Sequence, residues 1–144
     1  MRRLLLTAVA VAAVGCGGEK KADTAPAAPP PAGPVVVVNM TGNGQDKAAF
    51  EPSSLTIQSG TTVRFVNASG GPHNIAFSPD SVPQGGADAL RKGMPNPLTD
   101  LAGPFMTKQD EAYDVSFAGA PRGVYRGVCQ PHATLGMTIV ITVR

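Results

Sequence analysis

Short segments in which apolar and polar residues alternate recur along the chain after residue 34. Gly, Pro, Asn or Asp residues separate them, and alternation with a period of two is typical of a half-buried antiparallel sheet. Only residues 87–92 have the pattern of a helical turn. We therefore predict an all-β, Greek-key β-sandwich of about seven to eight strands. The segments are residues 35–40, 55–57, 63–65, 74–77, 113–117, 124–129 and 138–144.

Two of these segments flank a turn, and two others predict which side chains face the core. Residues 55–57 and 63–65 lie on either side of Ser59 and Gly60, which predicts a hairpin with one apolar face. Counting by twos along the last two segments places Met137 and Cys129 on the inner side, because successive side chains point to opposite faces of a sheet. The same count places Tyr125, Gly127, Ile139, Ile141 and Val143 inward.

The first sixteen residues have the organisation of an export signal. Arg2 and Arg3 precede an apolar run at residues 4–14, which is too short to cross a bilayer comfortably. Residues 13–16 resemble the lipobox of bacterial lipoproteins, in which the cysteine left by signal removal carries lipid, although Ala13 stands where that motif usually has Leu. The alternative is ordinary cleavage after an Ala-x-Ala pattern such as residues 10–12, which would leave a soluble protein. We expect lipid on Cys16.

This start of the chain and the residues that follow it predict the domain organisation. Residues 17–34 contain five prolines and five alanines, a composition that favours extended polyproline II and forms no core. We expect a signal peptide over residues 1–15, a lipid-anchored cysteine and Ala/Pro-rich linker over 16–34, and one folded domain over 35–144. The protein is then exported, periplasmic or at the cell surface, and held at a membrane through Cys16.

Composition limits the chemistry of the folded domain. The chain has 144 residues, two histidines and two cysteines, so it has room for one modest domain and no site with three histidines. From residue 35 onward there are eight basic and eight acidic residues, and this neutrality argues against a nucleic-acid partner.

A thiol, an imidazole and a thioether lie within nine residues, at Cys129, His132 and Met137, and His73 lies 56 residues before Cys129. A thiolate, two imidazoles and a weak axial thioether are the ligands of a blue copper site. Each residue also has an ordinary interpretation, for example Cys129 as a small buried hydrophobe. Taken together, the loop spacing, the distant histidine and the strand parity favour copper. A disulfide from Cys16 to Cys129 is disfavoured because it would span the linker.

The C-x2-H-x4-M loop of Cys129, His132 and Met137 resembles the small cupredoxins, the type 1 blue copper family, and among them the plastocyanins most and the pseudoazurins next. Residues 50–67 and 72–77 carry further likeness, and the resemblance covers about residues 35–144. It implies a cupredoxin domain that binds one type 1 copper through these three residues and His73.

The same resemblance implies further roles. Asn74 would brace the ligand loop and the cysteine sulfur, and the ring edge of His132 would reach the surface. We call the apolar neighbours of His132 the docking rim: Pro131, Leu135 and Gly136. The expected partners are redox proteins such as a c-type cytochrome or a membrane oxidoreductase, and the expected state is a monomer. Gly127 and Val128 depart from plastocyanin, which has a phenylalanine and, in plants, a tyrosine there.

The expected function is that of a non-enzymatic carrier of single electrons between exported or membrane redox partners. The alternative is a copper-binding or delivery protein without a carrier role, but five scattered methionines and a closed set of four ligands argue against it. A copper enzyme needs a second centre with more histidines, which this chain lacks. A metal-free structural sandwich remains a further alternative.

Overall fold

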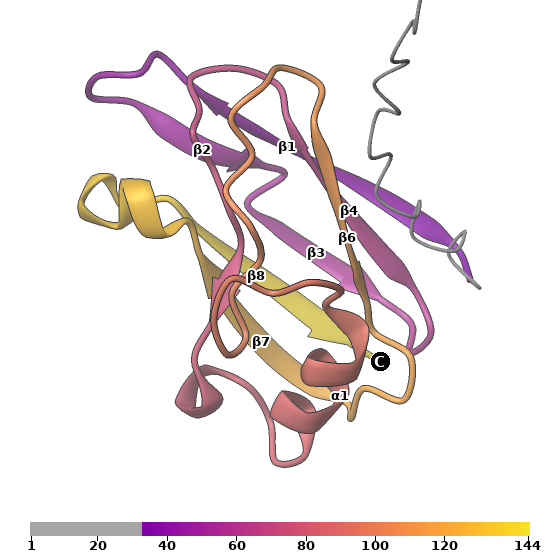
Figure 1. The fold of residues 1–144 in the computed structure, drawn as a ribbon. Coiled ribbons are helices and arrows are strands. Elements are labelled where there is room, and N and C mark those ends of the chain that lie inside the picture. The colour runs from indigo at the N-terminus through magenta and orange to yellow at the C-terminus, as the bar shows by residue number, and fades with distance from the viewer. Residues whose placement is uncertain (1–32) are drawn as a thin grey trace, which may run out of the picture.

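Two four-stranded β-sheets lie face to face in a computed structural model that describes residues 33–144 (Figure 1). The predicted signal peptide, Cys16 and the linker up to residue 32 lie outside the described residues. The first sheet has the order β2 (Ala48–Glu51), β1 (Val35–Gly42), β4 (Thr62–Asn67), β6 (Ala112–Ser116). The second has the order β3 (Ser54–Ile57), β8 (Thr138–Val143), β7 (Gly123–Val128), β5 (Ala76–Phe77).

This architecture confirms the predicted all-β sandwich, although the strands do not all pair as expected. Both sheets are mixed, since β1 runs parallel to β4 and β3 runs parallel to β8. The other pairs are antiparallel. Strand β2 was not predicted, because it is only four residues long and buries one large side chain, Phe50.

The predicted hairpin of residues 55–57 and 63–65 is wrong. Strand β3 pairs with β8, whereas β4 pairs with β1 and β6, so the chain passes from one sheet to the other at Ser59 and Gly60. Gly60 has a φ of 93°, and its N–H donates to the carbonyl of Phe117, the residue after β6, at 2.9 Å. Ile57 and Phe65 both face the core. Alternation fixes which face of each strand is buried, but it does not fix the partner of the strand.

The core lies between the sheets and follows the predicted parity. Tyr125, Cys129 and Met137 are buried, whereas Arg126 is exposed. Phe117 meets Tyr125 edge to face, with ring centroids 5.4 Å apart. The last strand buries the residues expected from the period of two: Ile139, Ile141 and Val143. The inner faces of β7 and β8 therefore carry Cys129 and Met137 to the same end of the sandwich.

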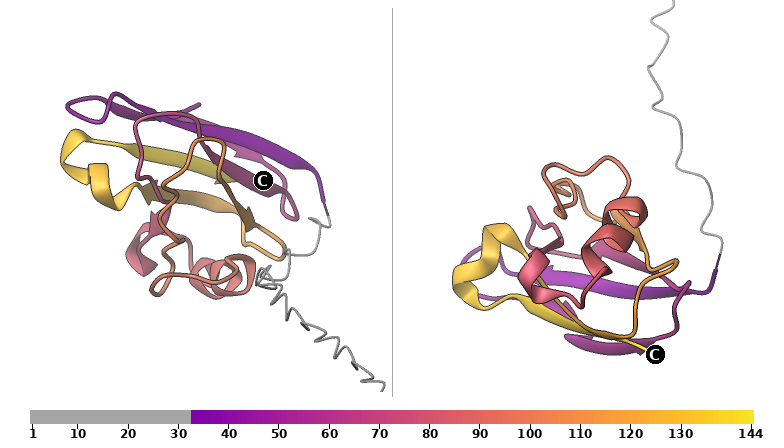
Figure 2. Two further views of the ribbon diagram at one scale, coloured as in Figure 1. Left: turned by 45° about the horizontal axis from the view of Figure 1, so that its top comes forward. Right: turned by 90° about the horizontal axis from the view of Figure 1, so that it is seen from below.

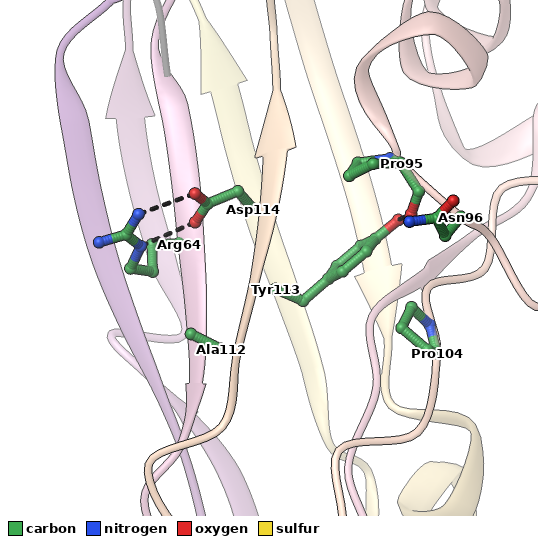
Figure 3. Close-up of a pocket in the computed structure, with 7 residues that line it drawn as sticks. All are labelled: Arg64, Pro95, Asn96, Pro104, Ala112, Tyr113 and Asp114. Atoms are coloured by element: carbon green, nitrogen blue, oxygen red, sulfur yellow. Dashed lines mark hydrogen bonds and ion pairs between the residues drawn. The ribbon is translucent and has the colours of Figure 1, made fainter. Parts of the chain in front are cut away.

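The segment between β5 and β6 contains η1 (Pro79–Ser81) and α1 (Gly86–Gly93) and lies against one side of the sandwich (Figure 2). The Tyr113 hydroxyl on β6 donates to the Pro95 carbonyl of this segment at 2.9 Å, and burial raises the pKa of Tyr113 to about 12. A hollow of about 260 Å³ adjoins this contact (Figure 3). Arg64 and Asp114 form a two-pronged ion pair at its edge. Among the described residues, no helix is long and apolar enough to span a bilayer.

Gly127 offers a test of how tightly the core is packed beside Cys129. A Cβ at this position would lie 2.6 Å from Ile75 Cδ1 and 3.1 Å from Ile139 Cγ2. We expect Gly127→Ala to lower the free energy of unfolding by about 1–3 kcal/mol through overpacking, as measured by chemical denaturation. The exposed neighbour supplies the control, because Arg126→Ala should change stability by less than about 0.5 kcal/mol. Equal stability of Gly127→Ala and the wild type would contradict this packing.

Candidate metal centre

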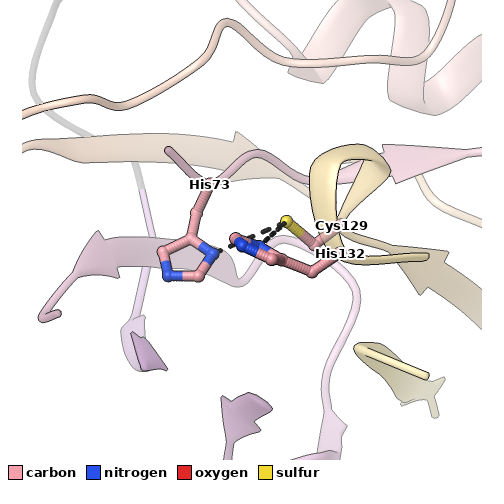
Figure 4. A group of neighbouring side chains, drawn as sticks. All are labelled: His73, Cys129 and His132. Atoms are coloured by element: carbon pink, nitrogen blue, oxygen red, sulfur yellow. Dashed lines mark hydrogen bonds between the residues drawn. The ribbon is translucent and has the colours of Figure 1, made fainter. Parts of the chain in front are cut away.

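Three side chains with metal-binding atoms meet at one end of the sandwich (Figure 4). His73 precedes β5, Cys129 follows β7, and His132 lies in η2 (Gln130–Leu135). Their ligand atoms all lie within 4.8 Å of one another. Cys129 Sγ is 3.6 Å from His73 Nδ1 and 3.5 Å from His132 Nδ1. One soft sulfur and two imidazole nitrogens form a donor set that suits copper.

A backbone carbonyl fixes the tautomer and the orientation of the His73 ring. Nε2 lies 2.8 Å from the Ser69 carbonyl oxygen, which can only accept, so Nε2 carries the hydrogen. The lone pair of Nδ1 is then free and faces the Cys129 sulfur. Burial lowers the pKa of His73, the Ser69 bond opposes that shift, and His132 adds to it. The ring is therefore neutral and oriented as metal-ligating histidines are.

The backbone of His73 is also held in place. His73 N–H donates to the Met106 carbonyl at 3.1 Å, and Met106 N–H donates to the His73 carbonyl at 2.8 Å. This isolated antiparallel bridge joins His73 to the segment that leads into β6. The side chain and the main chain of His73 are thus positioned by two different parts of the molecule.

Cys129 is fully buried at the end of β7. Burial raises the pKa of its thiol, while N–H groups of Asn74 and His132 that point at the sulfur act to lower it. A soft cation that binds a buried thiol would displace its proton to solvent and offset the charge of the thiolate. The buried sulfur is therefore better suited to binding a metal than to existing as a thiolate with no positive partner.

The loop from Cys129 to Met137 closes on itself. Cys129 N–H donates to the Met137 carbonyl at 3.0 Å, and Met137 N–H donates to the His132 carbonyl at 3.3 Å. Gly136 supplies the left-handed turn with a φ of 75°. Met137 is 1% exposed and sits beside Cys129 through this backbone contact. The structure thus groups three of the four predicted ligands by their donor atoms and places Met137 next to them.

Asn74 links the two segments that carry the clustered residues. Its Oδ1 accepts from the Gln130 N–H at 2.9 Å. Its Nδ2 donates to Gln130 Oε1 at 2.7 Å and to the Gly103 carbonyl at 3.2 Å. Asn74 is fully buried, so its bond to the Gly103 carbonyl is shielded from water, while the two bonds to Gln130 are part-buried. The residue that follows His73 is thereby fastened to the residue that follows Cys129.

His132 is the one member of the cluster that reaches the surface, since His73 and Cys129 are both buried and His132 is partly exposed. The docking rim around it, Pro131, Leu135 and Gly136, is exposed. Sequence reasoning missed Ser69 and Met106, although both hold His73. They act through backbone carbonyls and a backbone N–H, so no residue type at either position marks the role.

Comparisons with known proteins match this geometry. The sequence model of the copper-binding proteins of the plastocyanin/azurin family covers residues 36–144. Plastocyanin of Scenedesmus fuscus is 40% identical over 104 residues, which are 70% of this chain and 94% of that protein. Plastocyanin of Nostoc punctiforme is 39% identical over 103 residues, which are 70% of each protein.

Solved structures agree on the fold. A mutant plastocyanin of a fern superposes with a TM-score of 0.59 at 22% identity, over 76% of this chain and 100% of that one. Pseudoazurin from Hyphomicrobium denitrificans gives a TM-score of 0.51 at 20% identity, over 76% of this chain and 74% of that one. The fold is therefore shared with these two proteins.

The Asn74 contacts generate a prediction for the metal-free protein. Asn74→Asp keeps the shape of the side chain but replaces the Nδ2 donor with an oxygen that faces two acceptors. We expect the free energy of unfolding to fall by about 1–3 kcal/mol, because the buried Gly103 carbonyl and the Oε1 atom of Gln130 lose their donor. Denaturant titration of the wild type and the variant measures this change. Asn96→Asp, at an exposed position, is the control, and a similar small loss in both variants would show that the Asn74 bonds contribute little.

Proposed function

This chain belongs to the plastocyanin/azurin family of copper-binding proteins, and we propose that it is a type 1 copper electron carrier with His73, Cys129, His132 and Met137 as ligands. The observation that carries this proposal is the convergence of the Cys129 sulfur and one ring nitrogen from each of His73 and His132 within 4.8 Å. Copper bound there supplies a one-electron couple between Cu(II) and Cu(I).

The surrounding residues hold the proposed ligands in one arrangement. Ser69 holds the His73 ring, the Met106 bridge holds its backbone, and Asn74 fastens the two ligand segments together. Burial of His73 and Cys129 keeps water away from the sulfur. A ligand geometry that changes little between the two oxidation states suits rapid electron exchange, because few atoms have to move with each transfer.

Electrons would enter and leave at His132, the partly exposed ligand. The docking rim of Pro131, Leu135 and Gly136 carries no charge, which suits brief contact over a small interface. We propose redox proteins as partners, such as a c-type cytochrome or a membrane oxidoreductase, and a role without enzymatic activity of its own. The named relatives are plastocyanins, which supports a carrier over an enzyme.

The proposal includes the predicted organisation of the whole chain. Residues 1–15 would direct export, lipid on Cys16 would hold the protein at a membrane, and residues 16–34 would link that anchor to the cupredoxin domain of residues 35–144. The support is the pattern of the sequence itself, an apolar run that ends at Gly15 and Cys16 followed by an Ala/Pro-rich stretch. The carrier would then act as a monomer at the periplasmic or outer surface of a membrane.

The visible and electron paramagnetic resonance spectra of the Cu(II)-loaded protein test the carrier function. We expect an intense blue thiolate-to-copper band and a narrow hyperfine splitting, both lost on reduction and restored on reoxidation. Cys129→Ser, which removes the thiolate, should lack the blue band. A pale wild-type spectrum, or release of copper on each redox cycle, would favour a copper-delivery protein.

Met137 allows a separate test of the axial ligand. Met137→Leu preserves volume but removes the thioether, so we expect copper and colour to remain and the midpoint potential to rise by an amount on the order of tens of millivolts. Voltammetry measures this shift. Met94→Leu, at a buried methionine after α1, should leave the potential unchanged. Loss of all copper from Met137→Leu would contradict the assignment.

A further inference from the structure

We infer that Asn67, which is outside the ligand set, positions His73 for copper by holding the Met106 carbonyl to which His73 is bonded. The inference rests on the proposed function, because it concerns the same metal site. Asn67 is the last residue of β4 and is 2% exposed. It lies six residues before His73, at the start of the loop that carries the ligand.

The amide of Asn67 has a defined direction. Nδ2 donates to the Met106 carbonyl at 3.1 Å and to the Lys108 carbonyl at 3.0 Å. Carbonyl oxygens accept and do not donate, so only the NH₂ group of the amide fits against them. Among the described residues, Oδ1 has no hydrogen-bond partner. All hydrogen bonds of this side chain therefore serve the segment around Met106.

The Met106 carbonyl connects Asn67 to His73. It accepts from Asn67 Nδ2 and also from the His73 N–H at 3.1 Å, while the Met106 N–H returns a bond to the His73 carbonyl at 2.8 Å. The backbone of Asn67 bonds the same segment further along, since its N–H donates to Glu111 and its carbonyl accepts from Asp110. Asn67 thus fixes the position of the segment around Met106, with which the backbone of His73 is paired.

Packing around Gly71 places the amide directly beneath the ligand loop. A Cβ on Gly71 would lie 2.7 Å from Asn67 Nδ2 and 3.2 Å from the Met106 oxygen. The same loop carries Ser69, whose carbonyl accepts from the His73 ring. Both supports of His73, the Ser69 carbonyl and the Met106 bridge, therefore lie in segments that Asn67 joins.

Loss of the amide should affect the metal site without removing any ligand. The Met106 and Lys108 carbonyls would lose the Asn67 donor, residues 106–108 would relax, and the Nδ1 atom of His73 would no longer be held at one distance from the sulfur. Mutation of residues that hydrogen-bond to metal ligands and orient them typically lowers metal affinity by about ten- to a hundredfold. We expect a change at the low end of that range, because Asn67 acts through Met106.

The experiment compares Asn67→Ala with Asn67→Ser in the full chain. The serine variant keeps one donor, so its effect should be smaller. Val143→Ala is the control, because Val143 is buried at the opposite end of β8 from Met137 and its loss destabilises the core without touching the ligand segments. Metal-free samples are measured by amide hydrogen exchange at His73 and Met106, and copper-loaded samples by paramagnetic resonance, midpoint potential and copper retention.

The proposal expects exchange at His73 and Met106 to accelerate about tenfold more in Asn67→Ala than in the control, together with an altered hyperfine splitting, a shifted potential and about tenfold weaker copper retention. Unchanged exchange and an unchanged spectrum in a folded Asn67 variant would overturn it. Failure of both Asn67 variants to fold, while Val143→Ala folds, would also overturn it by making Asn67 a requirement of the whole fold. A wild type without a blue spectrum would refute the carrier function, while the exchange data would still judge the role of Asn67.

Discussion

The pairing of β5 with β7 is the constraint on which the site depends. This ladder has only two residue pairs, Ala76 with Val128 and Phe77 with Gly127, yet it sets the register between the segments that carry His73 and Cys129. A slip by one residue would turn every side chain of β5 to the other face of the sheet. The Asn74 amide continues the ladder beyond its last backbone pair by bonding Gln130. These bonds fix the register of β5, which its two backbone pairs alone would define only weakly.

Around this register, hydrogen bonds to the backbone hold the metal-binding atoms in place. Two of the three clustered residues are held by groups outside the ligand side chains: the His73 ring by the Ser69 carbonyl, the His73 backbone by Met106, and the Cys129 sulfur by the backbone N–H groups of Asn74 and His132. The function therefore resides as much in the ordered backbone as in the four side chains that would touch copper.

The sequence predicted those parts of the molecule that depend on residue type. Alternation predicted the buried faces of β7 and β8, and the spacing of Cys129, His132 and Met137 predicted the site, because few residue types serve as soft ligands. Strand pairing could not be predicted in the same way. The hairpin predicted at Gly60 is wrong, and β1 and β3 run parallel to β4 and β8, respectively. The supports of His73 were missed since Ser69 and Met106 act through their backbones.

One feature of the surface governs how such a carrier meets its partners. Of the three clustered residues, only His132 has any exposed area, and no aromatic side chain flanks Cys129 at positions 127 and 128 of β7. In the carrier that we propose, the donor and the acceptor would both dock at the face of His132, so the two partners would exclude each other. It alternates between them, and each complex has to dissociate before the next transfer can begin. Turnover then favours fast dissociation over tight binding, and weak affinity for both partners becomes a requirement of the function.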